Sequence, residues 1–294
     1  MKQVFMPLLL LAGLLSMNEA YSQKKPPAAV NAIMGGAQTD GGSSGSFKTV
    51  TASKVMEMKI PEGGANGAAV VYHPKEKLYY AAQAGNKEFP LVIFDADGNV
   101  VSSAEQATLI DVRGLWYNPD TKEIAGNGYK NFGWFRYSLT RKGLPESIDI
   151  FKEGRFQPDD HSPGVLNTKD DEVLFLDGLN ILCYTTKGVD KQKTIQIHVG
   201  AKSSDDATVT SQEFEDNYNT RSIVYTGNEG AEIGFLNVTK KQVELYNIKT
   251  GYMTKIVTVN LPFTPETFFN FSYSNNIYWF FNKQTRYWLG YKED

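Results

Sequence analysis

Residues 68–82 read AAVVYHPKEKLYYAA, an apolar run, a polar turn and a second apolar run. The same arrangement recurs as RGLWYNPDTKEIAG (113–126), PGVLNTKDDEVLFLD (163–177), RSIVYTGNEGAEIGF (221–235) and FNFSYSNNIYWFFN (269–282). Aligned at the end of the first run, the windows are 45, 49, 59 and 48 residues apart. Repetition at this period is typical of small sheets that cannot bury their faces alone and must stack against one another.

Each repeat continues into a third apolar strand. These strands read LVIFDADG, WFRYSLTRKG, ILCYTTKG, VELYNIKTG and YWLGYKED, and several end in a glycine of the kind that tight hairpins need. Alternating outer strands are expected within residues 100–110, 146–151, 193–199 and 253–261. The sequence therefore predicts an all-β fold, a five-bladed β-propeller over residues 47–294.

The last repeat has no fourth strand of its own. Residues 54–60 alternate apolar and charged side chains, with Met56, Met58 and Ile60 on one face. We expect this N-terminal segment to supply the missing outer strand, because joining the two chain ends in one sheet removes an open edge. The longest step contains a polar insertion at residues 200–220, which leaves a six-bladed propeller as an alternative.

The first 46 residues have the composition of a targeting signal followed by a linker. Lys2, an apolar run at 6–17 and small residues at 20–22 predict a signal peptide over residues 1–22. Residues 23–46 are rich in Pro, Gly and Ser and predict a flexible leader. We expect an exported protein, periplasmic or extracellular, without a membrane span. A net charge of −3 gives no support to a nucleic-acid partner.

This turn-and-strand pattern resembles exported propellers of the YncE, NHL and SMP-30 type. The nearest match to their third-strand hairpin is residues 94–98, FDADG. The resemblance implies the propeller fold over most of residues 54–294, but the superfamily includes lactonases, lyases, cofactor enzymes and binding modules. The calcium-ligand set of gluconolactonase-like members and the tryptophan motif of quinoprotein dehydrogenases do not occur at matching positions. No cofactor is predicted.

An enzyme of this architecture, such as the five-bladed furanosidases, needs carboxylates on the inner strands of different blades. The predicted inner strands carry apolar residues there instead. The sharpest catalytic candidates are Asp159, Asp160 and His161, but adjacent side chains on an extended chain point in opposite directions. No metal site is predicted, and a hydrolase or lyase acting on a glycan or small molecule is the alternative function.

The favoured function is a binding module. Arg113 and Arg221 align at the start of the innermost strand in two repeats, and Lys87 and Lys130 occupy loops expected on the same face. A partly enclosed positive mouth would favour an anionic ligand. The candidate stacking groups for a glycan are Tyr129, Phe132, Trp134 and Phe156. A protein partner is a further possibility, and the alternative for the arginines is that Arg113 pairs with Asp111 and Arg221 with an acid of the insertion.

Overall fold

The computed structural model describes residues 47–61, 66–88, 91–102, 109–188 and 191–294. The predicted signal peptide (1–22) and leader (23–46) lie outside this part. Within the described residues, no helix has the length and apolar character needed to cross a membrane.

Three sheets each consist of four antiparallel strands that follow one another in sequence. The first contains β2 (Asn66–His73), β3 (Leu78–Ala84), β4 (Leu91–Phe94) and β5 (Val100–Ser102). The second contains β6 (Val112–Asn118), β7 (Glu123–Gly128), β8 (Trp134–Leu139) and β9 (Pro145–Lys152), with the 3-10 turn η1 (Lys130–Phe132) before β8. The third contains β10 (Val165–Asn167), β11 (Glu172–Asp177), β12 (Asn180–Thr185) and β13 (Lys191–Gln196).

The fourth sheet has eight strands in the order β14-β15-β16-β17-β1-β20-β19-β18. One half contains β14 (Tyr218–Tyr225), β15 (Ile233–Asn237), β16 (Gln242–Tyr246) and β17 (Met253–Val259). The other half contains β18 (Phe271–Ser274), β19 (Ile277–Asn282) and β20 (Tyr287–Glu293), and β1 (Lys48–Lys59) lies between the halves.

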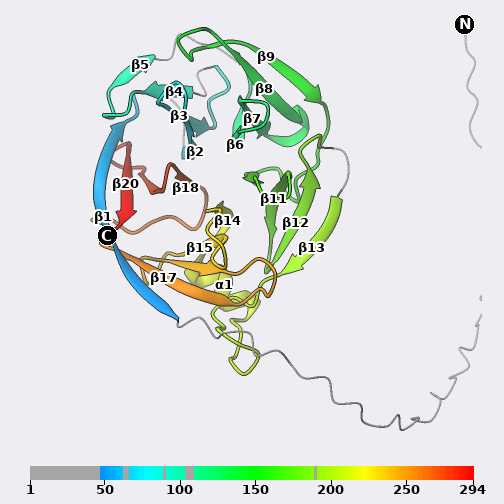
Figure 1. The fold of residues 1–294 in the computed structure, drawn as a ribbon, viewed down its shortest axis with the longest axis vertical. Helices are drawn as coiled ribbons and strands as arrows, with labels where there is room; N and C mark the ends of the chain where they lie inside the picture. Colours follow the sequence, from blue (N-terminus) through cyan, green and yellow to red (C-terminus); the bar gives the residue numbers. More distant parts are fainter. Residues whose placement is uncertain (1–46, 62–65, 89–90, 103–108, 189–190) are drawn as a thin grey trace, which may run out of the picture. The chain divides into compact units, whose positions relative to one another are not determined.

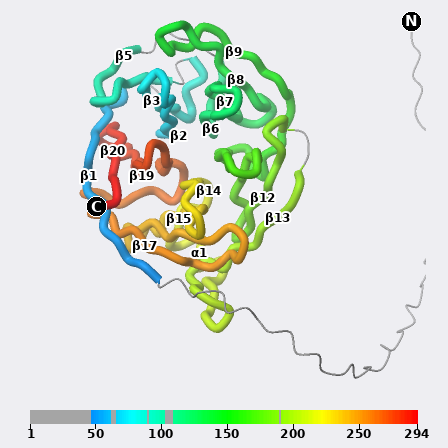
Figure 2. Tube along the Cα trace, in the orientation of Figure 1, coloured from blue at the N-terminus to red at the C-terminus, as the bar shows by residue number. Residues whose placement is uncertain are grey.

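The first strand pairs on both of its sides. Residues 52–59 run antiparallel to β20, with Met58 opposite Trp288, so the predicted pairing of residues 54–60 with the last repeat is confirmed. Residues 48–52 run parallel to β17, which was not anticipated. Strand β1 is thus the outer strand of the last repeat, and Figure 2 shows it in blue beside the red β20. Through β17 it also joins the last repeat to the preceding one.

The sheets surround a common centre. Figure 1 shows β2, β6, β14 and β18 toward the middle and β5, β9, β13, β17 and β1 at the outside. Five hydrophobic clusters lie between neighbouring sheets or between the two halves of the eight-stranded sheet, so each sheet is covered on both faces. Large aromatic side chains such as Trp134, Trp279 and Phe235 fill the space between sheets.

Two neighbouring sheets approach each other closely at Gly114. A Cβ added to Gly114 would lie 2.4 Å from the backbone nitrogen of Gly164, on the loop that leads into the neighbouring sheet. Asn127 bridges the same place, donating from Nδ2 to the carbonyl of Ser162 (3.0 Å) and accepting from the Gly164 N–H (2.9 Å). Glycine is therefore required at these positions by close backbone approach.

The insertion at residues 200–220 contains a helix. Helix α1 (Ser211–Asn217) begins with a reciprocal capping box between Thr210 and Glu213 and buries Phe214 against Tyr218. Apart from the first residues of β14, this insertion contains no strand. The strands that the six-bladed alternative requires are therefore not found in it.

Replacing Met58 by alanine tests the closure of the ring. Met58 is fully buried in a cluster with Trp279 and Trp288, so Met58→Ala is expected to lower the free energy of unfolding by about 2–5 kcal/mol. The control is Val55→Ala on the same strand, because Val55 is 52% exposed; its change is expected to stay within about 0.5 kcal/mol. Guanidinium denaturation measures both, and equal losses would contradict a central role for this strand.

Cys183 offers a chemical probe of the same packing. Its thiol is buried on β12, and burial raises the pKa of the thiol to about 12. Because the thiolate is the reactive form, we expect 5,5′-dithiobis(2-nitrobenzoate) to leave the folded protein unlabelled at pH 8. The denatured chain should take up one equivalent, since Cys183 is its single cysteine. Rapid labelling in native buffer would refute this placement.

Candidate functional site

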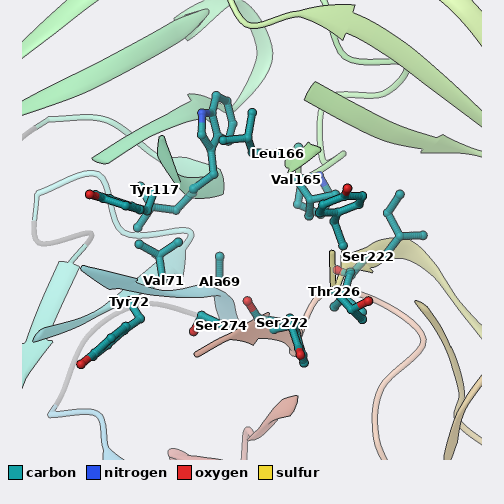
Figure 3. A pocket seen from close by; sticks show the side chains of 18 of the residues that line it. Ala69, Val71, Tyr72, Tyr117, Val165, Leu166, Ser222, Thr226, Ser272 and Ser274 are labelled. Carbon is teal, nitrogen blue, oxygen red and sulfur yellow. The ribbon is translucent and has the colours of Figure 1, made fainter. Parts of the chain in front are cut away.

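A cavity of about 280 Å³ lies at the centre of the ring, between the innermost strands. Residues of β2, β6, β10, β14 and β18 all line it, so each of the three four-stranded sheets and both ends of the eight-stranded sheet contribute a wall. Its apolar lining includes Ala69, Val71 and Val165 (Figure 3). Because these residues belong to strands packed into the sheets, the shape of the cavity is fixed by the fold.

Tyrosines line the end of the cavity at which the first strand of each repeat turns into the second. Tyr72, Tyr117, Tyr225 and Tyr273 occupy this place in four repeats, and Leu166 occupies it in the third. Burial raises the pKa of Tyr225, and it raises that of Tyr273 to about 12. Both hydroxyls therefore stay protonated near neutral pH and can donate hydrogen bonds.

Hydroxyl and amide groups complete the lining, and two serines in it differ in an informative way. The Ser272 hydroxyl accepts from the Val70 N–H (3.0 Å) and donates to the Val70 carbonyl (3.1 Å), which clamps β18 to β2. The Ser222 hydroxyl is buried and has no hydrogen-bond partner in the described part of the chain. This oxygen is covered by the surrounding wall, so it does not contact a molecule in the cavity.

The cavity carries no formal charge. Among the described residues that line it, none is Asp, Glu, Lys, Arg or His. The remaining polar lining consists of Thr168, Thr226, Ser274, Asn275 and Asn276. The arrangement suits a neutral molecule with several hydroxyl groups and apolar faces.

Arg113 lies at the opposite end of the central strands. It is 3% exposed. Its two terminal nitrogens contact the carboxylate of Asp111, with Nη2 to Oδ2 at 3.0 Å, and Nη1 also donates to the Val112 carbonyl. The guanidinium lies over the rings of Tyr129 (4.4 Å) and Phe269 (5.6 Å). The expected alternative, an ion pair with Asp111, is therefore confirmed, and Arg113 is enclosed within the protein.

Arg221 is more accessible. Its side chain is 30% exposed, its Nη2 lies 3.6 Å from Oδ2 of Asp159, and its guanidinium lies over the ring of Phe268 at 5.2 Å. The partner is not an acid of the insertion, as the alternative had it, because Asp159 on the loop before β10 is the residue within reach. A local sequence pattern does not reveal that contact across the ring.

The sequence-predicted residues at this end do come together. The ring of His161 lies 5.0 Å from that of Tyr129, and the backbone N–H of His161 donates to Oδ1 of Asp159 at 2.8 Å. Contacts therefore run from Arg113 through Tyr129 and His161 to Asp159, and from there to Arg221.

Several basic side chains at this end have a nearby acid. Asp160 pairs with Arg155 at 3.2 Å, and Lys283 pairs with Glu266 at 3.4 Å. Lys130 is exposed and lies over Tyr129 at 5.1 Å, and Lys87 is exposed on the loop after β3. Within the described ranges, no group of three or more His, Cys, Asp or Glu side chains is placed to hold a metal.

Trp134 requires a correction. It was expected among the stacking groups for a ligand, but it is fully buried and packs between Trp116, Phe175 and Tyr184. Position in a loop-strand junction does not distinguish a surface aromatic from a core one, and the neighbouring sheet covers this side chain. Trp134 stabilises the contact between the second and third sheets.

The backbone closes the ring at the arginine end. Phe269 and Asn270 both have positive φ, 49° and 61°, and two consecutive left-handed residues cost of order 1 kcal/mol each. They are held by hydrogen bonds from Asn219 Nδ2 to the Phe269 carbonyl (2.6 Å) and from the Asn270 N–H to the Gly67 carbonyl (3.0 Å). Phe269 is thereby fixed against Ala68, so the cavity has its tyrosine end as its mouth.

Sequence reasoning missed the tyrosines as functional candidates. Their signal was available, because the same aromatic residue stands at the aligned turn position in four of the five windows. It was used to align the repeats but not to locate a site.

Comparison with known proteins supports the fold. No family model matches the chain, and no curated protein sequence matches it. Among solved structures, Myxococcus xanthus glutaminyl cyclase is similar with a TM-score of 0.53 and 11% identity, covering 84% of this chain and 98% of that one. The β-propeller domain of Myceliophteria thermophila Cps50 (Swd1) has a TM-score of 0.46 and 7% identity, covering 82% and 99%.

At such low identity, the likeness concerns the fold alone. Together with the ring of four-stranded sheets, it defines the chain as a β-propeller. The enzymatic activity in the first neighbour's name belongs to that protein, because one fold supports many functions.

Alanine substitutions at the two aligned arginines are expected to differ. Arg113→Ala should lower the free energy of unfolding by about 3–5 kcal/mol, because it leaves Asp111 without its buried partner. Arg221→Ala should cost less than about 1 kcal/mol, since its ion pair is partly exposed. Thermal and guanidinium unfolding measure both. Similar losses for the two variants would contradict the distinction between an enclosed and an accessible arginine.

Proposed function

We propose that this chain is an exported, five-bladed β-propeller that binds a neutral carbohydrate in its central cavity without chemical turnover. The observation that carries the proposal is the cavity lining, which contains four tyrosines and a set of hydroxyl and amide groups and no charged side chain among the described residues. Aromatic faces pack on the C–H faces of sugars, and hydroxyl and amide groups fix their orientation.

The order of the eight-stranded sheet supports five blades. It places β1 between the four strands β14–β17 and the three strands β18–β20. Counting β1 with β18–β20 gives a fifth four-stranded unit among the described residues. The export of the protein rests on the sequence of residues 1–22 alone.

The size of the cavity supports a small ligand. A volume of about 280 Å³ is close to the lower end of the roughly 300–1,000 Å³ found for small-molecule sites. One or two sugar units at the end of a longer glycan would fill it. The glycan would enter at the tyrosine end, because Phe269 and Asn270 occupy the other.

A binding role is favoured over catalysis because of where the carboxylates lie. Hydrolysis of a glycan needs an acid and a second carboxylate beside the scissile bond. Asp111 and Asp159 both lie at the arginine end and both contact an arginine there. A hydrolase or lyase acting at that end remains the alternative function, and it predicts release of product from a glycan substrate.

Calorimetric titration with maltose, cellobiose, lactose and N,N′-diacetylchitobiose tests the proposal. We expect at least one neutral disaccharide to bind. Ser222→Ala should leave its affinity unchanged, because the unpartnered hydroxyl is buried beneath the cavity wall and is out of a ligand's reach. The same substitution should leave the melting temperature unchanged or slightly raised, since it removes an unsatisfied buried group.

A pair of tyrosine variants supplies the control. Tyr72→Leu removes an aromatic face from the cavity and should weaken binding, whereas Tyr252→Leu removes a tyrosine that stacks on His198 outside the cavity and should not. No heat with any of the four sugars, or equal effects of both variants, would overturn the proposal. Release of monosaccharide during incubation would support the hydrolase instead.

A further inference from the structure

A second cavity, distinct from the central one, lies beside Arg221. Its volume is about 360 Å³. Its walls come from four separate parts of the chain: the turn between β11 and β12, helix α1, the strand β14 that carries Arg221, and the segment before β18 that carries Thr267 and Phe268. None of its lining residues also lines the central cavity, so the two can be tested separately.

Arg221 has unused hydrogen-bonding capacity in this cavity. Its single side-chain charge contact is the 3.6 Å approach to Asp159, which is too long for a hydrogen bond. Its Nε is buried without a partner, and within the described part of the chain its side chain donates no hydrogen bond. A guanidinium presents its donors in a planar fork that matches a carboxylate.

Apolar side chains form one side of this cavity. Phe268 lies under the guanidinium and is 40% exposed, which is unusual for so large an apolar side chain on this protein. Leu179 and the edge of the buried Phe214 complete that side. The stacking on Phe268 holds the guanidinium in place while leaving its donors available.

The walls are also rigid. The Thr220 N–H donates to the Thr267 carbonyl at 2.8 Å, which ties the strand that carries Arg221 to the segment that carries Phe268. Helix α1 is fixed by its capping box and by Phe214, which contacts Tyr218 and Phe235. The cavity therefore exists before a ligand arrives, and a ligand needs to supply little ordering energy.

We infer that this cavity binds a small carboxylate with an apolar body, the carboxylate on Arg221 and the apolar part against Phe268 and Leu179. Glu215 is the acidic residue of the lining, and it is exposed. Its negative charge repels a carboxylate in the cavity and therefore lowers the affinity of the site for that ligand. This inference does not depend on carbohydrate binding in the central cavity.

Titration with N-acetyl-L-phenylalanine, compared with its neutral amide, tests the inference on the folded protein. We expect the acid to bind and the amide to bind at least about tenfold more weakly, because charge-assisted hydrogen bonds to a guanidinium are lost. Arg221→Gln should weaken the acid about tenfold or more and leave the amide unchanged. Glu215→Gln should tighten the acid about 2- to 5-fold by removing repulsion.

Arg155→Gln is the matched control, since Arg155 carries the same charge, is 45% exposed and pairs with Asp160. It should leave the affinity for the acid within twofold of the unsubstituted protein. Absence of binding by the acid at 10 mM, equal binding of acid and amide, or an unchanged affinity in Arg221→Gln would each overturn the inference. Neutral sugars should bind Arg221→Gln as they bind the unsubstituted protein, which separates this site from the central cavity.

Discussion

The ring depends on the double pairing of its first strand. A closed ring of sheets has one seam, where the end of the chain meets its beginning, and here β1 crosses that seam with hydrogen bonds on both edges. Its antiparallel partner is the last strand of the chain and its parallel partner is the outer strand of the preceding unit. The seam is therefore held by main-chain pairing as well as by side-chain packing, and no disulfide is available to hold it, since the chain has one cysteine.

The same closure dictates the chemistry of the central cavity. Sheets that radiate from an axis converge there, so the inner strands accept small residues such as Gly114, Ala68 and Ser222, while tryptophans fill the wider space farther out. A charged side chain near the axis would need a partner inside a narrow, partly dry space. The geometry that makes the ring stable therefore favours a neutral cavity lined by alanine, valine, serine and tyrosine.

The sequence predicts features that depend on neighbouring residues in the chain better than features that depend on contacts between repeats. The turn and strand pattern is local, so the strands, their order and the role of residues 54–60 followed from it. Arg113 and Arg221 occupy equivalent local positions, yet one is enclosed by Asp111 and Phe269 and the other lies beside Asp159. Burial of Trp134 likewise depends on the adjacent sheet. The sequence pattern of a single repeat does not predict its contacts with other repeats.

The two ends of the ring differ because the loops at one end are longer. Short turns join the first and second strands of each repeat and leave the tyrosines at an open mouth. The longer connections between repeats meet at the other end, where Phe269 and Asn270 adopt left-handed backbone conformations to cover the axis. Phe269 and Asn270 thus cover the axis at this end. The cavity beside Arg221 lies away from the axis, between Phe268 and helix α1. A central cavity without charged side chains among its described residues and a peripheral one that contains Arg221 and Glu215 are thus consequences of a single arrangement of loops.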